Sequence, residues 1–135
     1  MGDRNVQNIA EMFRGYITAA LWSSIDEEGT PLDHERDLSD IDETTLASLR
    51  ETVAEFYSGY RVDLFLYVQY KDVDPQWGTA WDYVGHDLWL TSNGHGAGFW
   101  DRDEVPKAIR DRLTEGARAL GEINLFVGDD GVIYA

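Results

Sequence analysis

The sequence lacks cysteine and long apolar runs, and it has few basic residues. Without cysteine the chain can form neither disulfides nor a thiolate metal site, which disfavours a small secreted scaffold. No apolar stretch approaches the ~20 residues that span a bilayer, and the first residues lack the basic and apolar parts of a signal peptide. These absences predict a soluble protein that works in the cytoplasm.

Only 11 basic residues stand against 26 acidic ones, which gives a net charge of -15. This excess makes direct binding to phosphate backbones or anionic lipids electrostatically unfavourable. Nucleic acid and membranes are therefore poor partners, whereas a protein that binds nucleic acid is a good one. The competing interpretation is that the acidity only keeps the protein soluble.

The length of 135 residues and the hydrophobic content of 43% predict one domain with one continuous core. Five Trp and seven Tyr residues supply large areas for burial, so we expect the core to be rich in aromatic side chains.

Apolar residues spaced three and four apart predict amphipathic helices. These cover about residues 5–22, 41–58 and 105–120, with a shorter helix from Pro75 to Gly85. Asp40 and Glu43 have the spacing of a capping box at the start of the second helix, and Gly59 is placed to end it.

Residues 60–70 alternate between two faces, which favours a strand and leaves a buried helix as the alternative. Two hairpins are expected, one from residues 88–91 and 97–100 and one from residues 123–127 and 132–134. The Asn93-Gly94 pair supports the first, because both residues tolerate a positive φ. The predicted fold class is α+β, with three to four helices packed on a small antiparallel sheet made of two hairpins.

Acidic residues concentrate between positions 26 and 55, where an exposed loop at about residues 23–40 leads into the second helix. The segment holds Asp26, Glu27, Glu28, Asp33, Glu35, Asp37, Asp40, Asp42, Glu43, Glu51 and Glu55, against only Arg36 and Arg50. Such a bias creates a local negative field beyond what solubility needs. The alternative is a solvated face beside a disordered loop.

Helical carboxylates three or four residues apart lie ~5 to 6 Å from each other, and duplex DNA carries one charge per ~1.7 Å of its axis. An acidic loop and helix can therefore approximate part of a row of phosphates and fit a groove lined with Arg and Lys. We expect the nine acids from Asp26 to Glu43 to bind such a partner.

A second group of candidate residues offers imidazole, amide and carboxylate chemistry. It comprises His86, Asp87, Asn93, His95 and Asp101, whose side chains could bind a ligand or exchange protons. Along a strand that rises ~3.3 Å per residue, the two histidines would lie too far apart for one metal ion. The structural interpretation is that Asn and Gly meet backbone demands while the aromatic residues pack. No metal, cofactor or catalytic residue is assigned.

The stretch GHDLWLTSNGHGAGFWDR, which begins at Gly85, and the closing GDDGVIY together resemble the core motif of a known family. This family consists of small, mostly acidic proteins encoded by tailed bacteriophages and related mobile elements, and the resemblance extends from about Gly85 to Tyr134. The family has no established activity. The resemblance therefore implies a phage-type setting in a bacterial host and supplies no mechanism.

The leading hypothesis is an acidic accessory protein that binds a basic host protein, as a DNA mimic that inhibits restriction or CRISPR machinery. The rival is a small enzyme or ligand-binding protein with a site around His86, Asp87, Asn93, His95 and Asp101. A homo-oligomer that buries its aromatic surface is a third possibility, and the oligomeric state stays open.

Overall fold

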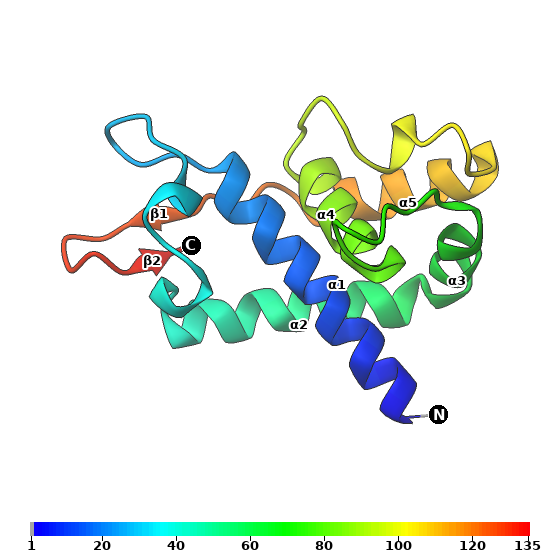
Figure 1. Ribbon diagram of the computed structural model, residues 1–135, viewed down its shortest axis with the longest axis horizontal. Coiled ribbons are helices and arrows are strands. Elements are labelled where there is room, and N and C mark those ends of the chain that lie inside the picture. The colour runs from blue at the N-terminus through cyan, green and yellow to red at the C-terminus, as the bar shows by residue number, and fades with distance from the viewer. Residues whose placement is uncertain (1) are drawn as a thin grey trace.

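The computed structural model describes residues 2–135, and helices dominate this part of the chain (Figure 1). The five α-helices are α1 (Gly2–Ser23), α2 (Glu43–Gly59), α3 (Arg61–Tyr70), α4 (Ala80–Ser92) and α5 (Lys107–Ala119). Three short 3-10 helices are η1 (Leu32–His34), η2 (Leu38–Asp40) and η3 (Phe99–Asp101). The strands β1 (Phe126–Val127) and β2 (Ile133–Tyr134) pair antiparallel.

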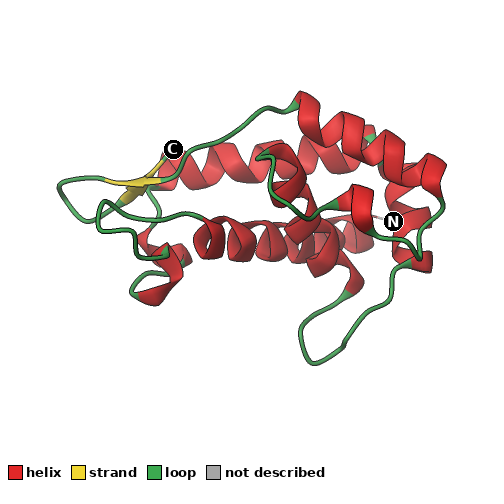
Figure 2. Ribbon diagram, turned by 90° about the horizontal axis from the view of Figure 1, so that it is seen from above, coloured by secondary structure: helices red, strands yellow, loops and turns green. Residues whose placement is uncertain are grey.

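The predicted α+β class holds in its coarse form, and its details need correction. Within the described residues there are five α-helices rather than three to four, and one hairpin rather than two. The hairpin lies at one end of the molecule with the C-terminus, beyond the ends of the helices (Figure 2). Within residues 2–135 the fold is therefore a helical assembly with a terminal hairpin, which adds Ile133 to the common core.

Helix α1 crosses in front of α2 and lies beside α4, with which it makes the most extensive helix contact of the described residues (Figure 1). Two glycines allow this close approach. A Cβ on Gly85 of α4 would lie 1.7 Å from the carbonyl oxygen of Met12, and one on Gly15 of α1 would lie 1.9 Å from that of Asp82. The two backbones thus meet at a distance that no other residue permits.

The core is rich in aromatic side chains, as the composition predicts. Tyr16 of α1 and Trp89 of α4 are both buried and meet edge to face, with ring centroids 5.3 Å apart. Phe99 of η3 packs edge to face against Tyr67 of α3 at 5.3 Å. These contacts join the helices to the connecting segments in one cluster of buried residues.

The predicted strand over residues 60–70 is wrong, because this segment forms α3. Tyr60 separates α2 from α3, and its carbonyl accepts the first hydrogen bond of α3 from the Leu64 amide. Leu64 and Tyr67 are buried on one helical face, whereas Val62 is exposed. The alternation in the sequence therefore does not match the observed pattern of burial.

The predicted hairpin over residues 88–100 is also wrong. Residues 88–91 belong to α4, which passes through Gly85 instead of ending there, and residues 99–101 form η3. The Asn93-Gly94 signal is a helix end, since Asn93 caps α4 and Gly94 follows with a φ of +70°. The chain then folds back on α4, where the Phe99 amide donates to the Thr91 hydroxyl at 3.0 Å.

The predicted start of the shorter helix at Pro75 is wrong, because α4 begins at Ala80 with the side chain of Thr79 as its cap. The remaining predicted elements are confirmed with small shifts in their ends. Residues 5–22, 41–58 and 105–120 correspond to α1, α2 and α5, and the second hairpin forms as β1 and β2. The cap of α2 is Asp42 rather than Asp40, and its carboxylate accepts a bond from the Thr45 amide. No helix in residues 2–135 has the length and apolarity to cross a membrane.

Candidate partner-binding surface

The loop predicted at residues 23–40 is folded onto the body of the protein. Ile25 and Pro31 form an isolated antiparallel bridge, and the Leu32 amide donates to the Ser24 carbonyl at 2.9 Å. The side chain of Leu32 is completely buried. In Figure 1 this segment lies beside the hairpin, and the Asp42 amide ties the start of α2 to Ile133 of β2.

Four of the eleven acids in residues 26–55 stabilise local turns. The Asp26 carboxylate accepts bonds from the amides of Glu28 and Thr30. The Asp37 carboxylate accepts the Ser39 amide, and the Asp40 carboxylate accepts the Asp37 amide, which together form a capping box on η2. The Asp42 carboxylate caps α2. The side-chain and backbone amide bonds from Ser39 hold the pKa of Asp37 below its usual value. These four carboxylates therefore have structural roles of their own.

The other seven acids are exposed and are called the seven exposed acids below. They are Glu27, Glu28, Asp33, Glu35, Glu43, Glu51 and Glu55. Their side chains form no hydrogen bond and no ion pair with any residue in the range 2–135. Their charges consequently face solvent without local compensation.

Basic residues are paired mostly outside this segment. Among the described residues seven basic side chains form ion pairs, and only Arg36, 3.9 Å from Asp26, pairs with an acid of residues 26–55. The other basic residue of the segment, Arg50, lies 4.8 Å from the centre of the Phe13 ring. The negative field is thus concentrated in the acidic segment, because neutralisation occurs elsewhere in the molecule.

The fold adds an acid from the hairpin that sequence reasoning missed. A shallow cleft is lined by residues 26–28, Glu35 and Arg36 on one side and by residues 127–129 on the other. Asp129 thereby joins the acids of the loop, although about 100 residues separate them in the chain. The sequence shows Asp129 and Asp130 as neighbours in the predicted turn, but only the contact between hairpin and loop reveals that Asp129 lies beside the acids of the loop.

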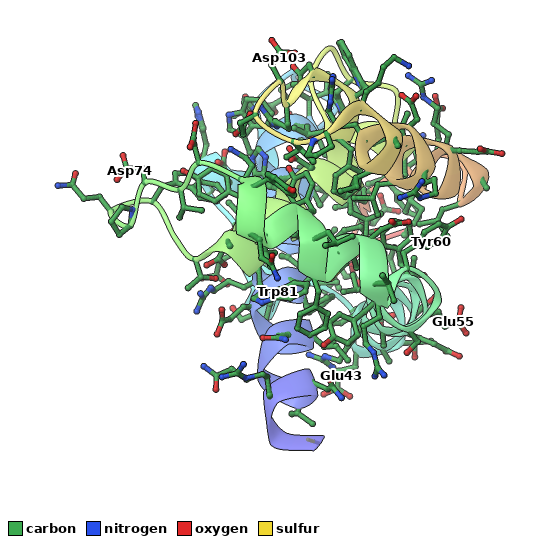
Figure 3. The ribbon with its side chains drawn as sticks, turned by 90° about the vertical axis from the view of Figure 1, so that its right-hand side faces the viewer. Glu43, Glu55, Tyr60, Asp74, Trp81 and Asp103 are labelled. Carbon is green, nitrogen blue, oxygen red and sulfur yellow. The ribbon has the colours of Figure 1, made fainter. Side chains whose placement is uncertain are left out.

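Helix α2 extends the surface as a row of carboxylates. Glu43, Glu51 and Glu55 are all exposed, and at ~3.6 residues per turn they spread over about a third of the helix circumference, with Glu51 and Glu55 as i,i+4 neighbours. At 1.5 Å per residue, the row spans about 18 Å. Figure 3 labels Glu43 and Glu55, the two ends of this row.

The five residues proposed as a ligand site lie in three different surroundings. His86 is in contact with the rings of Trp22 and Trp77. Asn93 and His95 line a polar pocket between the end of α1 and residues 122–125. Asp87 and Asp101 both lie beside Arg102. The pocket that Asn93 and His95 line does not include His86.

Asp87 is the centre of a buried charge network. Its side chain is 1% exposed and accepts a hydrogen bond from the Tyr67 hydroxyl. It also accepts hydrogen bonds from Nη2 of Arg102 and from Nε of Arg102, and the Nε bond is 3.1 Å long. Burial, together with the nearby Asp87 carboxylate, raises the pKa of Tyr67 well above its usual value. Asp101 lies 3.6 Å from Arg102 and accepts the Gly98 amide. This network fixes α3, α4 and the segment that follows η3, and it leaves Asp87 no free lone pair facing solvent.

No group of three or more potential metal ligands occurs among the described residues. The residue types that suggested proton transfer therefore do not converge. In the pocket lined by Asn93 and His95, the Asn93 side chain is already engaged in structural hydrogen bonds, since it donates to the Trp89 carbonyl and accepts the Ile123 amide.

His86 is expected to titrate below its ordinary pKa of 6.5, because burial disfavours the imidazolium and Arg102 opposes it, against a smaller attraction from Asp87. Below pH 6.5 the unfolded chain then binds a proton that the folded chain resists. The free energy of unfolding should fall as the pH decreases from 6.5, until the pH is below the folded pKa.

NMR titration of the imidazole signals measures this pKa directly. Urea unfolding at pH 7 and pH 5 should show a smaller difference for His86→Gln than for the wild type. A midpoint at or above 6.5 would contradict the assigned burial of His86.

Comparisons with known proteins do not assign a function to this surface. No protein-family model, curated protein or solved structure matches the chain significantly. The predicted resemblance to phage proteins thus stays a prediction, and the functional interpretation rests on the chemistry of the chain's own residues.

Proposed function

We propose that the chain is a phage- or mobile-element-encoded acidic accessory protein that binds a basic host protein in place of DNA, at the restriction or CRISPR machinery. The observation that carries this proposal is the set of seven exposed acids without partners among the described residues. They lie in a loop and on the exposed side of α2, in a chain of net charge -15.

A DNA-binding groove lined with Arg and Lys is complementary to such a surface. Complementary charges accelerate encounter and fix the orientation of a partner, and they exclude nucleic acid and anionic lipid as partners. Because exposed charges are screened over about 8 Å at physiological ionic strength, the affinity should fall steeply with salt. Ordering of the loop favours binding too, because fewer residues lose freedom on association.

The test is capture of host proteins on the immobilised chain at about 50 mM and about 200 mM salt, a range over which charge-driven binding weakens strongly. The captured protein is expected to bind nucleic acid itself, to be released at the higher salt and to be displaced by duplex DNA. Purified partner then allows the affinities of variants to be measured.

The variant Glu27→Gln/Glu28→Gln/Asp33→Asn/Glu35→Gln removes four exposed charges that form no side-chain hydrogen bond or ion pair among the described residues. We expect its affinity to fall at least about tenfold, chiefly through slower association. The control, Asp72→Asn/Asp103→Asn/Glu115→Gln/Glu122→Gln, removes four exposed charges elsewhere, of which only Asp103 has an ion-pair partner, Arg110 at 3.7 Å. Equal losses in both variants, or a partner that duplex DNA does not displace, would refute a localised DNA-mimicking surface.

A further inference from the structure

An aromatic cluster lies on the surface at the junction of α1, α4 and the loop of residues 71–79. We call Trp22, Trp77, Tyr83 and His86 the aromatic cluster. His86 is its centre, with ring centroids 6.0 Å from Trp22 and 5.1 Å from Trp77. Trp77 also packs on Tyr83, at 4.5 Å. Three separate segments of the chain thus bring four aromatic rings together.

Two large rings of the cluster remain exposed to solvent. Trp22 is 54% exposed and Trp77 is 45% exposed, whereas Trp89 of the same helix pair is buried. Both exposed rings are held in place, since each contacts the half-buried His86. Ordered, exposed tryptophans of this kind are the residue type most enriched at the energetic centres of protein interfaces.

The cluster already binds one cation, which belongs to the chain itself. The ammonium group of Lys71 lies 4.5 Å from the centre of the Tyr83 ring and 3.0 Å from the Glu104 carboxylate. The combination of ring face and carboxylate that holds Lys71 is the combination that attracts cations in general. The rings of Trp22 and Trp77 have no such cation among the described residues.

The loop that carries Trp77 also carries an exposed carboxylate, that of Asp74. The Asp74 amide donates to the Tyr83 hydroxyl at 3.1 Å, and the exposed Asp74 carboxylate forms no ion pair with residues 2–135. Figure 3 shows Asp74 on a loop that projects from the body of the molecule. Trp22 is followed within six residues by Asp26, Glu27 and Glu28, so the cluster is continuous in sequence with the acidic segment.

We propose that the aromatic cluster binds an arginine side chain of the basic partner, whose guanidinium stacks on Trp22 and Trp77. This inference rests on the proposed function, and it assigns the contact that adds arginine selectivity to a surface otherwise governed by charge. A guanidinium is planar and weakly hydrated, so it stacks on indole rings better than an ammonium does. Lysine would satisfy the carboxylates equally well and the rings less well.

Two synthetic peptides of equal length and charge provide the test, one with arginine and one with lysine at every basic position. Calorimetry at about 50 mM salt should give tighter binding of the arginine peptide to the wild-type chain, by about tenfold. In NMR spectra of the indole N–H groups, the arginine peptide should shift the signals of Trp22 and Trp77 and leave that of the buried Trp89 in place.

The double variant Trp22→Leu/Trp77→Leu should bind both peptides equally, with thermal unfolding used to verify its fold. Trp100→Leu is the matched control, because Trp100 is 39% exposed and makes no ring contact with the cluster. It should keep the tenfold preference. The four-charge variant of residues 27–35 should weaken both peptides by the same factor and also keep the preference.

The possible failures are distinguishable. If neither peptide binds the wild type at low salt, the proposed function is wrong. If both bind with equal affinity, or if the double variant keeps the preference for arginine, the surface still binds cations and the assignment to the aromatic cluster is wrong.

Discussion

Replacing Gly85 by alanine is expected to lower the free energy of unfolding by about 3 kcal/mol. The added Cβ would lie 1.7 Å from the Met12 carbonyl oxygen and 2.7 Å from the Tyr16 amide nitrogen, both in the backbone of α1. A backbone cannot rotate out of the way as a side chain can. The methyl group must therefore push α1 and α4 apart along the most extensive contact between helices in residues 2–135.

Gly59→Ala is the matched control, since Gly59 is also helical, as the last residue of α2, and an added Cβ there would meet nothing within 4 Å. It should leave stability unchanged or raise it by about 0.5 kcal/mol, because alanine restricts the unfolded chain. Urea denaturation followed by tryptophan fluorescence measures both variants. Gly15→Ala should resemble Gly85→Ala, since its Cβ would lie 1.9 Å from the Asp82 carbonyl oxygen. Equal stabilities of Gly59→Ala and Gly85→Ala would refute the close helix crossing.

Glycine is also the point at which sequence reasoning about α4 failed. A glycine after apolar residues at helical spacing usually ends a helix, and Asn-Gly usually marks a tight hairpin. In this chain Gly85 serves a neighbouring helix that lies about 70 residues earlier in the sequence, and Asn93-Gly94 ends the helix that Gly85 continues. Both signals report a real backbone demand. Which demand it is depends on a long-range contact that local spacing does not contain.

The prediction of a strand over the segment that forms α3 was wrong for a related reason. Alternation over residues 60–70 is equally compatible with a strand and with a helix that is apolar on several sides. A strand would need neighbours to pair its amide and carbonyl groups, and the only strands of the described residues pair with each other at the far end of the molecule. The helices at 5–22, 41–58 and 105–120 were predictable because their periodicity admits one interpretation.

The composition reveals the acidic segment, but it does not reveal which of its acids stabilise turns and caps and which are free in solvent. Sequence treats Asp26, Asp37, Asp40 and Asp42 as equal to their exposed neighbours, whereas the fold uses these four for turns and caps. Substituting them would therefore perturb folding and charge together. The seven exposed acids permit a cleaner test, because their side chains form no hydrogen bond and no ion pair within residues 2–135.

Replacing Asp87 by asparagine should also destabilise the fold strongly, by about 3 kcal/mol. Asp87 is 1% exposed, and it is the carboxylate that neutralises Arg102 and accepts the Tyr67 hydroxyl. Asparagine preserves the shape and removes the charge, so the partly buried guanidinium loses its main counterion and keeps only the more distant Asp101, at 3.6 Å. The hydrogen bond to Asp87 is the leading cause that raises the pKa of Arg102 in the wild type, and the variant loses this cause. A guanidinium nevertheless stays protonated in proteins, so Arg102 remains charged and cannot relieve the imbalance by losing its proton.

Asp63→Asn is the control for removal of one paired carboxylate. Asp63 binds Arg112 through two nitrogens, at 2.8 and 3.1 Å to Oδ1, yet the Arg112 side chain is largely in solvent. Water replaces the lost partner there, and little change in stability is expected. Urea denaturation of the two variants should thus separate a buried ion pair from an exposed one with the same chemistry.

The triple variant Tyr67→Phe/Asp87→Leu/Arg102→Met decides whether charge pairing or shape is responsible. It removes all three polar partners at once and leaves no buried group unpaired, so stability should return to within about 1 kcal/mol of the wild type. If the triple variant is as unstable as Asp87→Asn, the network stabilises the fold through packing that leucine and methionine cannot reproduce. A full recovery would mean that Asp87 is a structural carboxylate, which the partner-binding surface does not need.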